Sequence, residues 1–280
     1  MSFLPLKERS FTVKIMSEKI YKLLQQGKRI DERTPYEFRK ITMQTNVVEK
    51  ANGSALVSVG STRILTGIKV ELGTPYSDRP NEGVFSVNAE LLPLASKSFE
   101  PGPPDERGIE LARVVDRCIR EGKAIDLEKL CIIPGKLVYI LYIDIYVLDY
   151  DGNYFDPSVI SAMAALATCT IPKYSATGER VEGEYMRVPI RDVPLSSTIG
   201  IIKDKLLVDP CLVEENSLDT SIVVCMDSAS NVVAIQKNSP GHIPLSLMES
   251  IINVAEEQIS RIRTQFKEVI GIEKEGREHC

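Results

Sequence analysis

Three arginines at helical spacing are the first residues in this sequence whose arrangement could do chemistry. Arg113, Arg117 and Arg120 lie in the segment D-E-R-G-I-E-L-A-R-V-V-D-R-C-I-R-E, residues 105–121. At about 100° per residue they fall in one arc of a helix, opposite a broad apolar face. A guanidinium group can form two parallel hydrogen bonds with one phosphate, so this arc could hold a nucleic-acid backbone. The simpler alternative is a solvated helix face that binds nothing.

A second group that could do chemistry is a run of carboxylates in the C-terminal third, namely Asp204, Asp209, Glu214, Glu215 and Asp219. Acids near strand ends could bind magnesium or act as general acid and base. Most acids at loop ends are instead solvated or cap a helix, so spacing alone does not favour catalysis. No phosphate loop, dinucleotide fingerprint or HExxH motif is present, and we expect neither a cofactor nor a metal.

The six cysteines and two histidines do not form a metal-binding pattern. The cysteines never come in the close pairs of zinc or dithiol motifs, and several lie in apolar runs, where cysteine acts as a small hydrophobic residue. The histidines, His242 and His279, are too few and too distant for a shared metal. The cysteine pattern therefore favours reduced thiols in an intracellular protein. No apolar run is long enough for a membrane span, so we expect a cytoplasmic protein.

Composition places a further limit on nucleic-acid binding. The chain has 280 residues and a net charge of -5, with a pI of about 5.4. A protein of this charge does not bind nucleic acids indiscriminately. Any contact with a phosphate backbone must therefore be local, as the arginine arc would be.

The elements that position these groups can be read from turn residues and periodicity. Pro103 and Pro104 favour an extended segment before the arginine helix, and Asp105 places a negative charge where a helix N-terminus favours one. Gly122 could end the helix in the left-handed conformation. The run L-V-Y-I-L-Y-I-D-I-Y-V-L within residues 132–150 predicts a strand buried on both faces.

The rest of the chain alternates between strand and helix patterns. We predict a short helix capped by Ser17, a hairpin turning at Gly60-Ser61, and a turn at 151–153 that leads into a small-residue helix. Residues 173–187 look like an exposed loop. The predicted strands lie at 41–48, 84–92, 198–208, 220–226 and 232–236, and a long helix covers 245–269.

These elements divide the chain into two α+β halves of similar plan. The expected organisation is an N-terminal arm and short helix at 1–27, a first half at 28–187, a second half at 188–270 and a charged tail at 271–280.

Several motifs carry a family resemblance that covers nearly the whole chain. These are F-E-P-G-P-P-D-E-R-G-I-E-L-A-R-V-V-D-R-C-I-R, N-G-S-A-L-V-S-V-G-S-T, P-N-E-G, L-C-I-I-P-G-K-L-V and L-D-Y-D-G-N. Together they closely resemble the RNase PH family, and within it the non-catalytic RNase PH-like subunit of the archaeal exosome. The resemblance implies an α+β fold of the RNase PH and ribosomal protein S5 domain 2 type. That fold has two β-α-β halves with mixed sheets and packed helices.

Two departures from active members of that family bear on catalysis. Active members carry Gly, then Ser or Thr, then Arg in the turn that binds phosphate, whereas this chain has N-Y-F-D at 153–156. Active members also carry two aspartates six residues apart. The matching positions here are Glu215 and Ser221, although a slip of one or two residues would bring Asp219 nearby. The resemblance therefore implies a subunit without its own active site.

The function implied by the resemblance is that of a non-catalytic, RNA-binding ring subunit of a phosphorolytic 3′-to-5′ exoribonuclease complex. The expected partners are RNA, a catalytic sister subunit in a ring of three heterodimers, and cap proteins with S1 or KH modules, with no membrane. Arg113 and Arg117 would hold the RNA backbone near the sister's active site, and Arg120 would be a third contact.

Two alternatives remain open at this point. The chain could degrade RNA by itself, with Asp209, Glu215 or Asp219 in altered catalytic roles. It could also be a structural spacer in which each arginine pairs with a nearby acid such as Glu110, Asp116 or Glu121.

Overall fold

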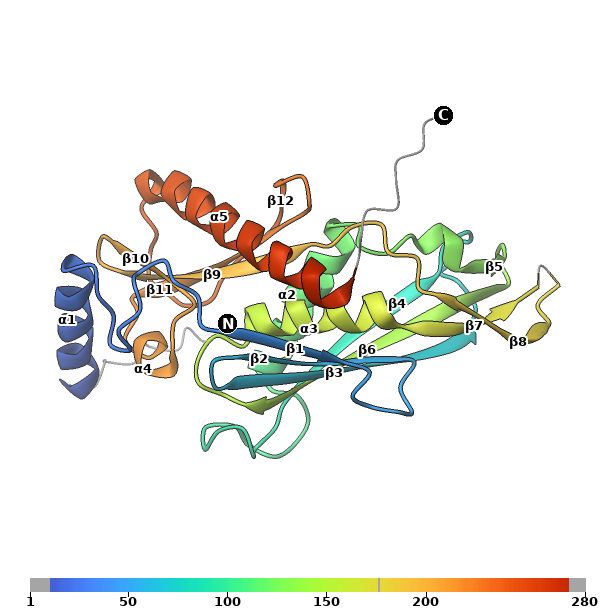
Figure 1. The fold of residues 1–280 in the computed structure, drawn as a ribbon, viewed down its shortest axis with the longest axis horizontal. Helices are drawn as coiled ribbons and strands as arrows, with labels where there is room; N and C mark the ends of the chain where they lie inside the picture. The colour runs from blue at the N-terminus through green and yellow to red at the C-terminus, as the bar shows by residue number, and fades with distance from the viewer. Residues whose placement is uncertain (1–10, 176, 272–280) are drawn as a thin grey trace.

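The computed structural model of the protein describes residues 11–175 and 177–271 (Figure 1). The first ten residues of the predicted N-terminal arm and the predicted charged tail beyond residue 271, with His279 and Cys280, lie outside the described residues. The fold consists of two sheets with a helix between them, and a third, two-stranded sheet at one end.

The first sheet is built around one long central strand. Its order is β1 (Ile41–Thr45), β2 (Gly53–Val59), β3 (Thr62–Gly73), β6 (Leu137–Asp149) and β4 (Val84–Leu91), and the short β5 (Cys131–Ile133) also pairs with β6. β4 and β6 are parallel and the other pairs are antiparallel. Helix α2 (Glu106–Glu121) lies between β4 and β6 in the chain, followed by the 3-10 helix η1 (Leu127–Leu130). This half is therefore the expected β-α-β unit with a mixed sheet.

The second sheet is antiparallel throughout, which corrects the prediction that both sheets are mixed. Its order is β10 (Lys205–Val208), β9 (Leu195–Ile202), β11 (Thr220–Met226) and β12 (Val232–Lys237). Tight turns join β9 to β10 and β11 to β12, and such turns reverse the chain direction. The one-turn helix α4 (Leu212–Glu215) joins β10 to β11, and α5 (Leu245–Ile270) packs against β9 and β11.

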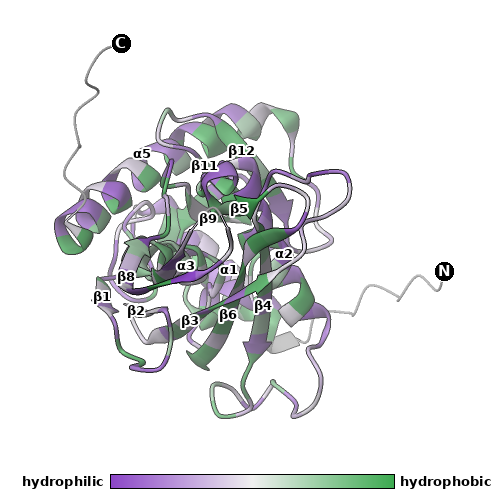
Figure 2. Ribbon diagram, turned by 90° about the vertical axis from the view of Figure 1, so that its right-hand side faces the viewer, coloured by the Kyte–Doolittle hydropathy of each residue, from purple (hydrophilic) through white to green (hydrophobic). Residues whose placement is uncertain are grey.

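Helix α3 (Phe155–Thr168) forms the centre of the molecule. It packs against β2 and β3 of the first sheet and against β9 of the second, as Figure 2 shows from one end of the molecule. All but its last residue are buried. Its many Ala and Ser side chains suit this place, because small residues let a helix approach two sheets at once. One continuous hydrophobic core results, with contributions from both halves.

Three predicted elements differ from the structure. The strand β6 is buried on one face only: its buried residues alternate with half-exposed ones such as Tyr142 and Tyr146, whose rings contributed to the apolar pattern. Residues 173–187 are not a plain loop but belong mostly to the exposed hairpin β7 (Thr170–Tyr174) and β8 (Arg180–Arg187). Helix α1 begins at Phe11 and ends at Gln25, so Ser17 lies inside it rather than at its cap.

Helix α1 has its own small contact area with the second sheet. Ile20 and Leu24 pack with Ile202, Leu207 and Leu218 in a cluster separate from the main core. None of the helices in the described part of the chain is both long and apolar enough to span a membrane. The five cysteines in that part are free thiols, as expected.

Candidate nucleic-acid interface

Helix α2 has the two faces that its sequence predicts. Asp105 caps its N-terminus by accepting hydrogen bonds from the backbone N–H groups of Arg107 (3.1 Å) and Gly108 (3.0 Å). Its buried residues are Gly108, Leu111, Val114, Val115, Cys118 and Ile119. The opposite face is open to solvent. The helix packs against β4 on one side and β12 on the other, so both halves of the fold fix its position.

The end of α2 differs from the prediction at Gly122. This residue has φ -73 and stays in the right-handed helical region, and Lys123 takes the left-handed conformation with φ 48. Glycine is needed for another reason. A Cβ atom at position 122 would lie 2.5 Å from the carbonyl oxygen of Cys118 and 2.7 Å from Cβ of Pro194. Gly122 therefore allows the close approach of the second half to the end of α2.

An open cavity of about 520 Å³ lies along the solvent side of α2, between this helix and β4. We call it the α2–β4 groove. Its lining includes Tyr76, Phe85, Ile109 and all three arginines of the predicted arc. The structure thus brings Arg113, Arg117 and Arg120 together at one groove.

The three arginines are not equivalent in the structure. Arg113 and Arg117 are exposed, and neither forms a hydrogen bond or ion pair with any residue in the described part of the chain. Their guanidinium groups keep all their donors for a ligand. This arrangement does not match a spacer whose arginines are all engaged by nearby acids.

Arg120, by contrast, is held by its neighbours. Its Nη2 and Nε donate to the carboxylate of Asp116 at 2.7 and 3.0 Å, and its Cζ lies 4.0 Å from the centre of the Phe85 ring. The hydrogen bond with Asp116 raises the pKa of Arg120 further above its usual value. Arg120 therefore has fewer free donors than the other two arginines.

The two segments in which the family resemblance implies a departure from active members lie against each other in the structure. The first is the turn at Asp151-Gly152-Asn153, where Gly152 has φ 83 and Asn153 has φ 49. The second contains α4. A Cβ on Gly152 would lie 2.5 Å from the backbone of Cys211 and Leu212, so the turn packs directly on the second segment. No pattern in the sequence indicates that these segments, about 60 residues apart, meet.

Glu215 joins the two segments by hydrogen bonds. It accepts from the hydroxyl of Tyr150 at 2.7 Å and from the backbone N–H of Asn153 at 2.6 Å. Burial raises the pKa of Glu215, and burial together with the nearby Glu215 carboxylate raises that of Tyr150. Both carboxylate oxygens of Glu215 therefore bind groups of the protein itself.

Aromatic rings fill the space beside this turn. Phe99, Tyr150, Tyr154 and Phe155 form a chain with ring centres 5.1, 5.5 and 4.7 Å apart. Tyr154 is 7% exposed and Phe155 is 5% exposed. In the turn where the family resemblance implies a phosphate site, this chain has large buried rings.

The other acids of the predicted group are also engaged. Asp219 accepts from the backbone N–H of Lys203 at 2.6 Å, and Ser221 is nearly buried beside Asn238. Glu214 is fully buried and paired with Arg29. Asp31, Cys211 and Glu214 come close enough to share a metal ion, but the Arg29 guanidinium already supplies the positive charge there.

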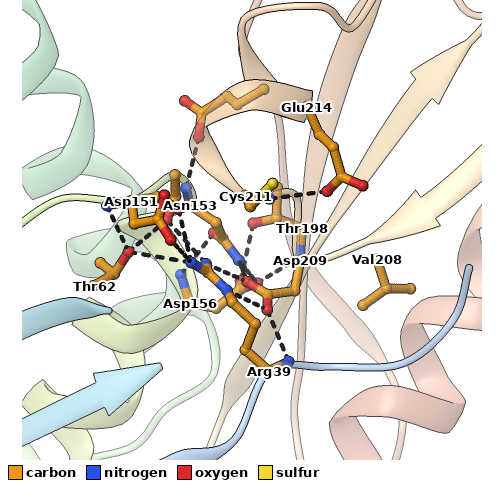
Figure 3. A network of polar contacts seen from close by, with 12 residues as sticks. Arg39, Thr62, Asp151, Asn153, Asp156, Thr198, Val208, Asp209, Cys211 and Glu214 are labelled. Atoms are coloured by element: carbon orange, nitrogen blue, oxygen red, sulfur yellow. Dashed lines mark hydrogen bonds and ion pairs between the residues drawn. The ribbon is translucent and has the colours of Figure 1, made fainter. Parts of the chain in front are cut away.

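A buried polar network centred on Asp209 was missed by the sequence reasoning (Figure 3). Arg39 donates to the Asp209 carboxylate through Nη2 at 2.7 Å and Nε at 2.8 Å, and Asn153 donates to it at 2.8 Å. Burial acts to raise the pKa of Asp209, but the hydrogen bonds and charge of Arg39 outweigh this and hold it below its usual value.

Asp156 extends the network into the centre of the fold. It accepts hydrogen bonds from Ser196, Thr198 and Asn153 and is completely buried, and burial raises the pKa of its carboxyl group. The network connects the segment before β1, the turn after β6 and the second sheet. Its role is to hold the two halves together.

Fold and site together define a two-half α+β protein with a cationic groove at one helix and protein side chains packed around the turn before α3. The chain matches the models of the 3′ exoribonuclease family, domain 1 over residues 37–172 and domain 2 over residues 192–258. It belongs to this family, known as the RNase PH family, and the predicted resemblance and fold class are confirmed.

Similar proteins come from archaea. The Thermococcus gammatolerans protein named exosome complex component Rrp42 is 46% identical, over 92% of this chain and 96% of its own length. A structure described as an Archaeoglobus fulgidus exosome with RNA bound to the active site has a chain that is 44% identical. That match has a TM-score of 0.85 and covers 92% of this chain and all of the other. A second structure, of an archaeal exosome core, matches with a TM-score of 0.81 and 41% identity, over 91% of this chain and 98% of the other.

Proposed function

We propose that this chain is a non-catalytic, RNA-binding ring subunit of an exosome, a complex that degrades RNA from its 3′ end by phosphorolysis. The observation that carries the proposal is a pair of exposed arginines at an open groove, Arg113 and Arg117, which have no bonding partner among the described residues. The similarity to proteins named as exosome components, and to a subunit of an exosome with bound RNA, supports it.

The non-catalytic part of the proposal is supported by the turn before α3. Large buried rings occupy the positions of the family's phosphate-binding residues, and Glu215 uses both its oxygens within the protein. Ser221 cannot replace a second aspartate, because a hydroxyl group does not carry negative charge at neutral pH. The residues that bind phosphate and the pair of acids would therefore have to come from a sister subunit.

In this proposal Arg113 and Arg117 hold phosphates of the RNA strand and Arg120 is a weaker third contact. Nε and Nη2 of Arg120 already bind Asp116, which leaves Nη1 for RNA. Such contacts position the strand without reading its sequence. The expected ring of three heterodimers, the cap proteins with S1 or KH modules and the cytoplasmic location remain part of this proposal.

RNA crosslinking tests the proposed groove. The complex of this chain with its RNase PH-like sister would be irradiated with an oligonucleotide that contains 4-thiouridine, and the crosslinked peptides would be identified by mass spectrometry. We expect peptides from 106–121 and none from the β8 hairpin, which also carries two exposed arginines, Arg180 and Arg187. Crosslinks confined to other segments, at an RNA concentration that saturates binding, would contradict the proposal.

A further inference from the structure

One exposed aromatic side chain lines the α2–β4 groove without any structural reason to be there. Tyr76 is 62% exposed, although its ring is large and apolar. Within the described residues its ring packs on no other aromatic ring and its hydroxyl group forms no hydrogen bond. Its position therefore contributes little to the stability of the fold.

The backbone around Tyr76 is fixed, so the ring is presented by a rigid loop. Tyr76 accepts a hydrogen bond from the N–H of Arg79 at 3.1 Å, which closes a turn. Two further backbone bonds attach the loop to the body of the protein. Gly135 donates to Pro80 at 2.7 Å, and Gly83 donates to Leu127 at 2.8 Å.

Tyr76 also lies close to the arginine face. It lines the same open cavity as Arg113, Arg117 and Arg120, and after the hydrogen bond with Asp116 it makes a smaller contribution to the raised pKa of Arg120. The Phe85 ring and the carboxylate of Asp116 hold the guanidinium of Arg120 in place. At the Arg120 end of the groove an exposed ring and a fixed cation thus line one surface, next to the exposed Arg113 and Arg117.

This combination fits one class of ligand better than others. A free phosphate or another small anion needs cations but no exposed ring. A single-stranded nucleic acid needs both, because cationic groups follow its backbone while aromatic side chains stack on its bases. Ile109, 53% exposed, adds a second apolar surface to the same groove.

We infer that Tyr76 is a base-stacking platform for the RNA strand whose phosphates are held by Arg113 and Arg117. This inference rests on the proposed function and adds to it a contact with a base. Because every base has a π face, the platform would add affinity for single strands with little sequence preference.

Substitutions at Tyr76 test the inference by their effect on affinity and on its salt dependence. The variants Tyr76→Ala and Tyr76→Phe would be prepared in the full chain assembled with its sister, and binding of labelled oligoadenylate would be measured. Loss of one stacked base should weaken binding by about 5- to 150-fold for Tyr76→Ala. Tyr76→Phe should keep the wild-type affinity. The slope of affinity against salt should not change, since no phosphate contact is lost.

Tyr185 provides a matched control. It is 61% exposed, nearly as much as Tyr76, and lies on β8 rather than at the groove. Tyr185→Ala should leave RNA affinity unchanged. The chain contains no tryptophan, so Tyr76→Trp and Tyr185→Trp each introduce one indole into it. We expect oligoadenylate to quench the fluorescence of Trp at position 76 and not at position 185.

The outcomes separate this inference from the proposed function. If Tyr76→Ala binds RNA normally while Arg113→Ala plus Arg117→Ala weakens binding, the platform is wrong and the proposed function stands. If Tyr76→Ala releases the sister subunit, Tyr76 is a protein contact and the inference is also wrong. If the wild-type complex binds no RNA, both the stacking inference and the proposed function are wrong.

Discussion

Removing the two exposed arginines of α2, Arg113 and Arg117, should weaken RNA binding in a way that depends on salt. In the double variant Arg113→Ala plus Arg117→Ala the ring loses two proposed phosphate contacts per copy of this chain. Each contact to a single strand contributes about 0.7 to the slope of log affinity against log salt, so the slope should fall by about 1.4. From 50 to 200 mM salt, the ratio of wild-type to variant affinity should then fall by about sevenfold.

The fold itself should tolerate this change. Both side chains are exposed and form no bond within the described part of the chain, and such surface substitutions usually change stability by less than about 0.5 kcal/mol. The apolar face of α2 is untouched. We therefore expect an intact ring with lower affinity at low salt and slower degradation of RNA by the sister subunit.

The assay needs a control for net charge. Arg180→Ala plus Arg187→Ala also removes two exposed positive charges, from β8 at the far end of the molecule (Figure 1). Ring mass, RNA affinity at both salt concentrations and degradation rate would be measured for both double variants. The proposed phosphate contacts are wrong if the ring with the α2 variant dissociates, if its RNA affinity and degradation rate equal those of the wild type, or if the β8 control changes them as much.

Three further predictions concern residues that hold the groove and the fold. Arg120→Ala should lower the free energy of unfolding in urea by about 1 kcal/mol, through loss of the Phe85 and Asp116 contacts. Arg120→Ala should change the slope of log RNA affinity against log salt less than loss of Arg113 does. An unchanged free energy of unfolding would count against a structural role for Arg120. Asp209→Asn should lower the free energy of unfolding by about 3–5 kcal/mol, because the Arg39 guanidinium stays buried without its charged partner. Since the pKa of Asp209 is lowered by folding, its contribution is present above its usual pKa and is lost as pH falls through the lower folded-state pKa. The variant should therefore lose less stability on acidification than the wild type, and equal acid sensitivity would refute the pairing. Gly122→Ala should lower the free energy of unfolding by about 1–3 kcal/mol, because the new methyl group would overlap the ring of Pro194. A melting temperature equal to that of the wild type would show that this contact can relax.

Local signals in the sequence predicted most of the elements. Asp105 caps α2 as expected, and the long strand, its turn at Gly152 and the buried helix α3 follow one another as the pattern indicates. These features depend on residues close in the chain. What the pattern could not show is which face of β6 is exposed, because tyrosines are compatible with either side of a sheet.

The different roles of the three arginines could be predicted from the sequence only in part. Asp116 lies four residues before Arg120, a spacing that favours an ion pair on a helix. Glu110 and Glu121 are equally well spaced for Arg113 and Arg117, yet they do not pair with them. Glu110 accepts instead from Gln236 on β12 at 2.7 Å, a contact between residues far apart in the chain.

The hydrogen-bond network around Asp209 was even harder to predict from the sequence. Arg39 and Asp209 are separated by 170 residues, and no periodicity relates them. The sequence shows only that a basic segment and an acidic one exist. The pairing depends on how the two halves pack, which is a property of the whole fold.

The proposal that this chain is a non-catalytic RNA-binding subunit can be tested by the release of nucleoside diphosphates from RNA and inorganic phosphate, measured for the purified chain and for its complex with the RNase PH-like sister. We predict no release by the chain alone, with or without magnesium, and release by the complex that Arg113→Ala plus Arg117→Ala in this chain slows. Turnover by the chain alone that Asp219→Asn abolishes would contradict the account, because it would assign a working active site to this subunit.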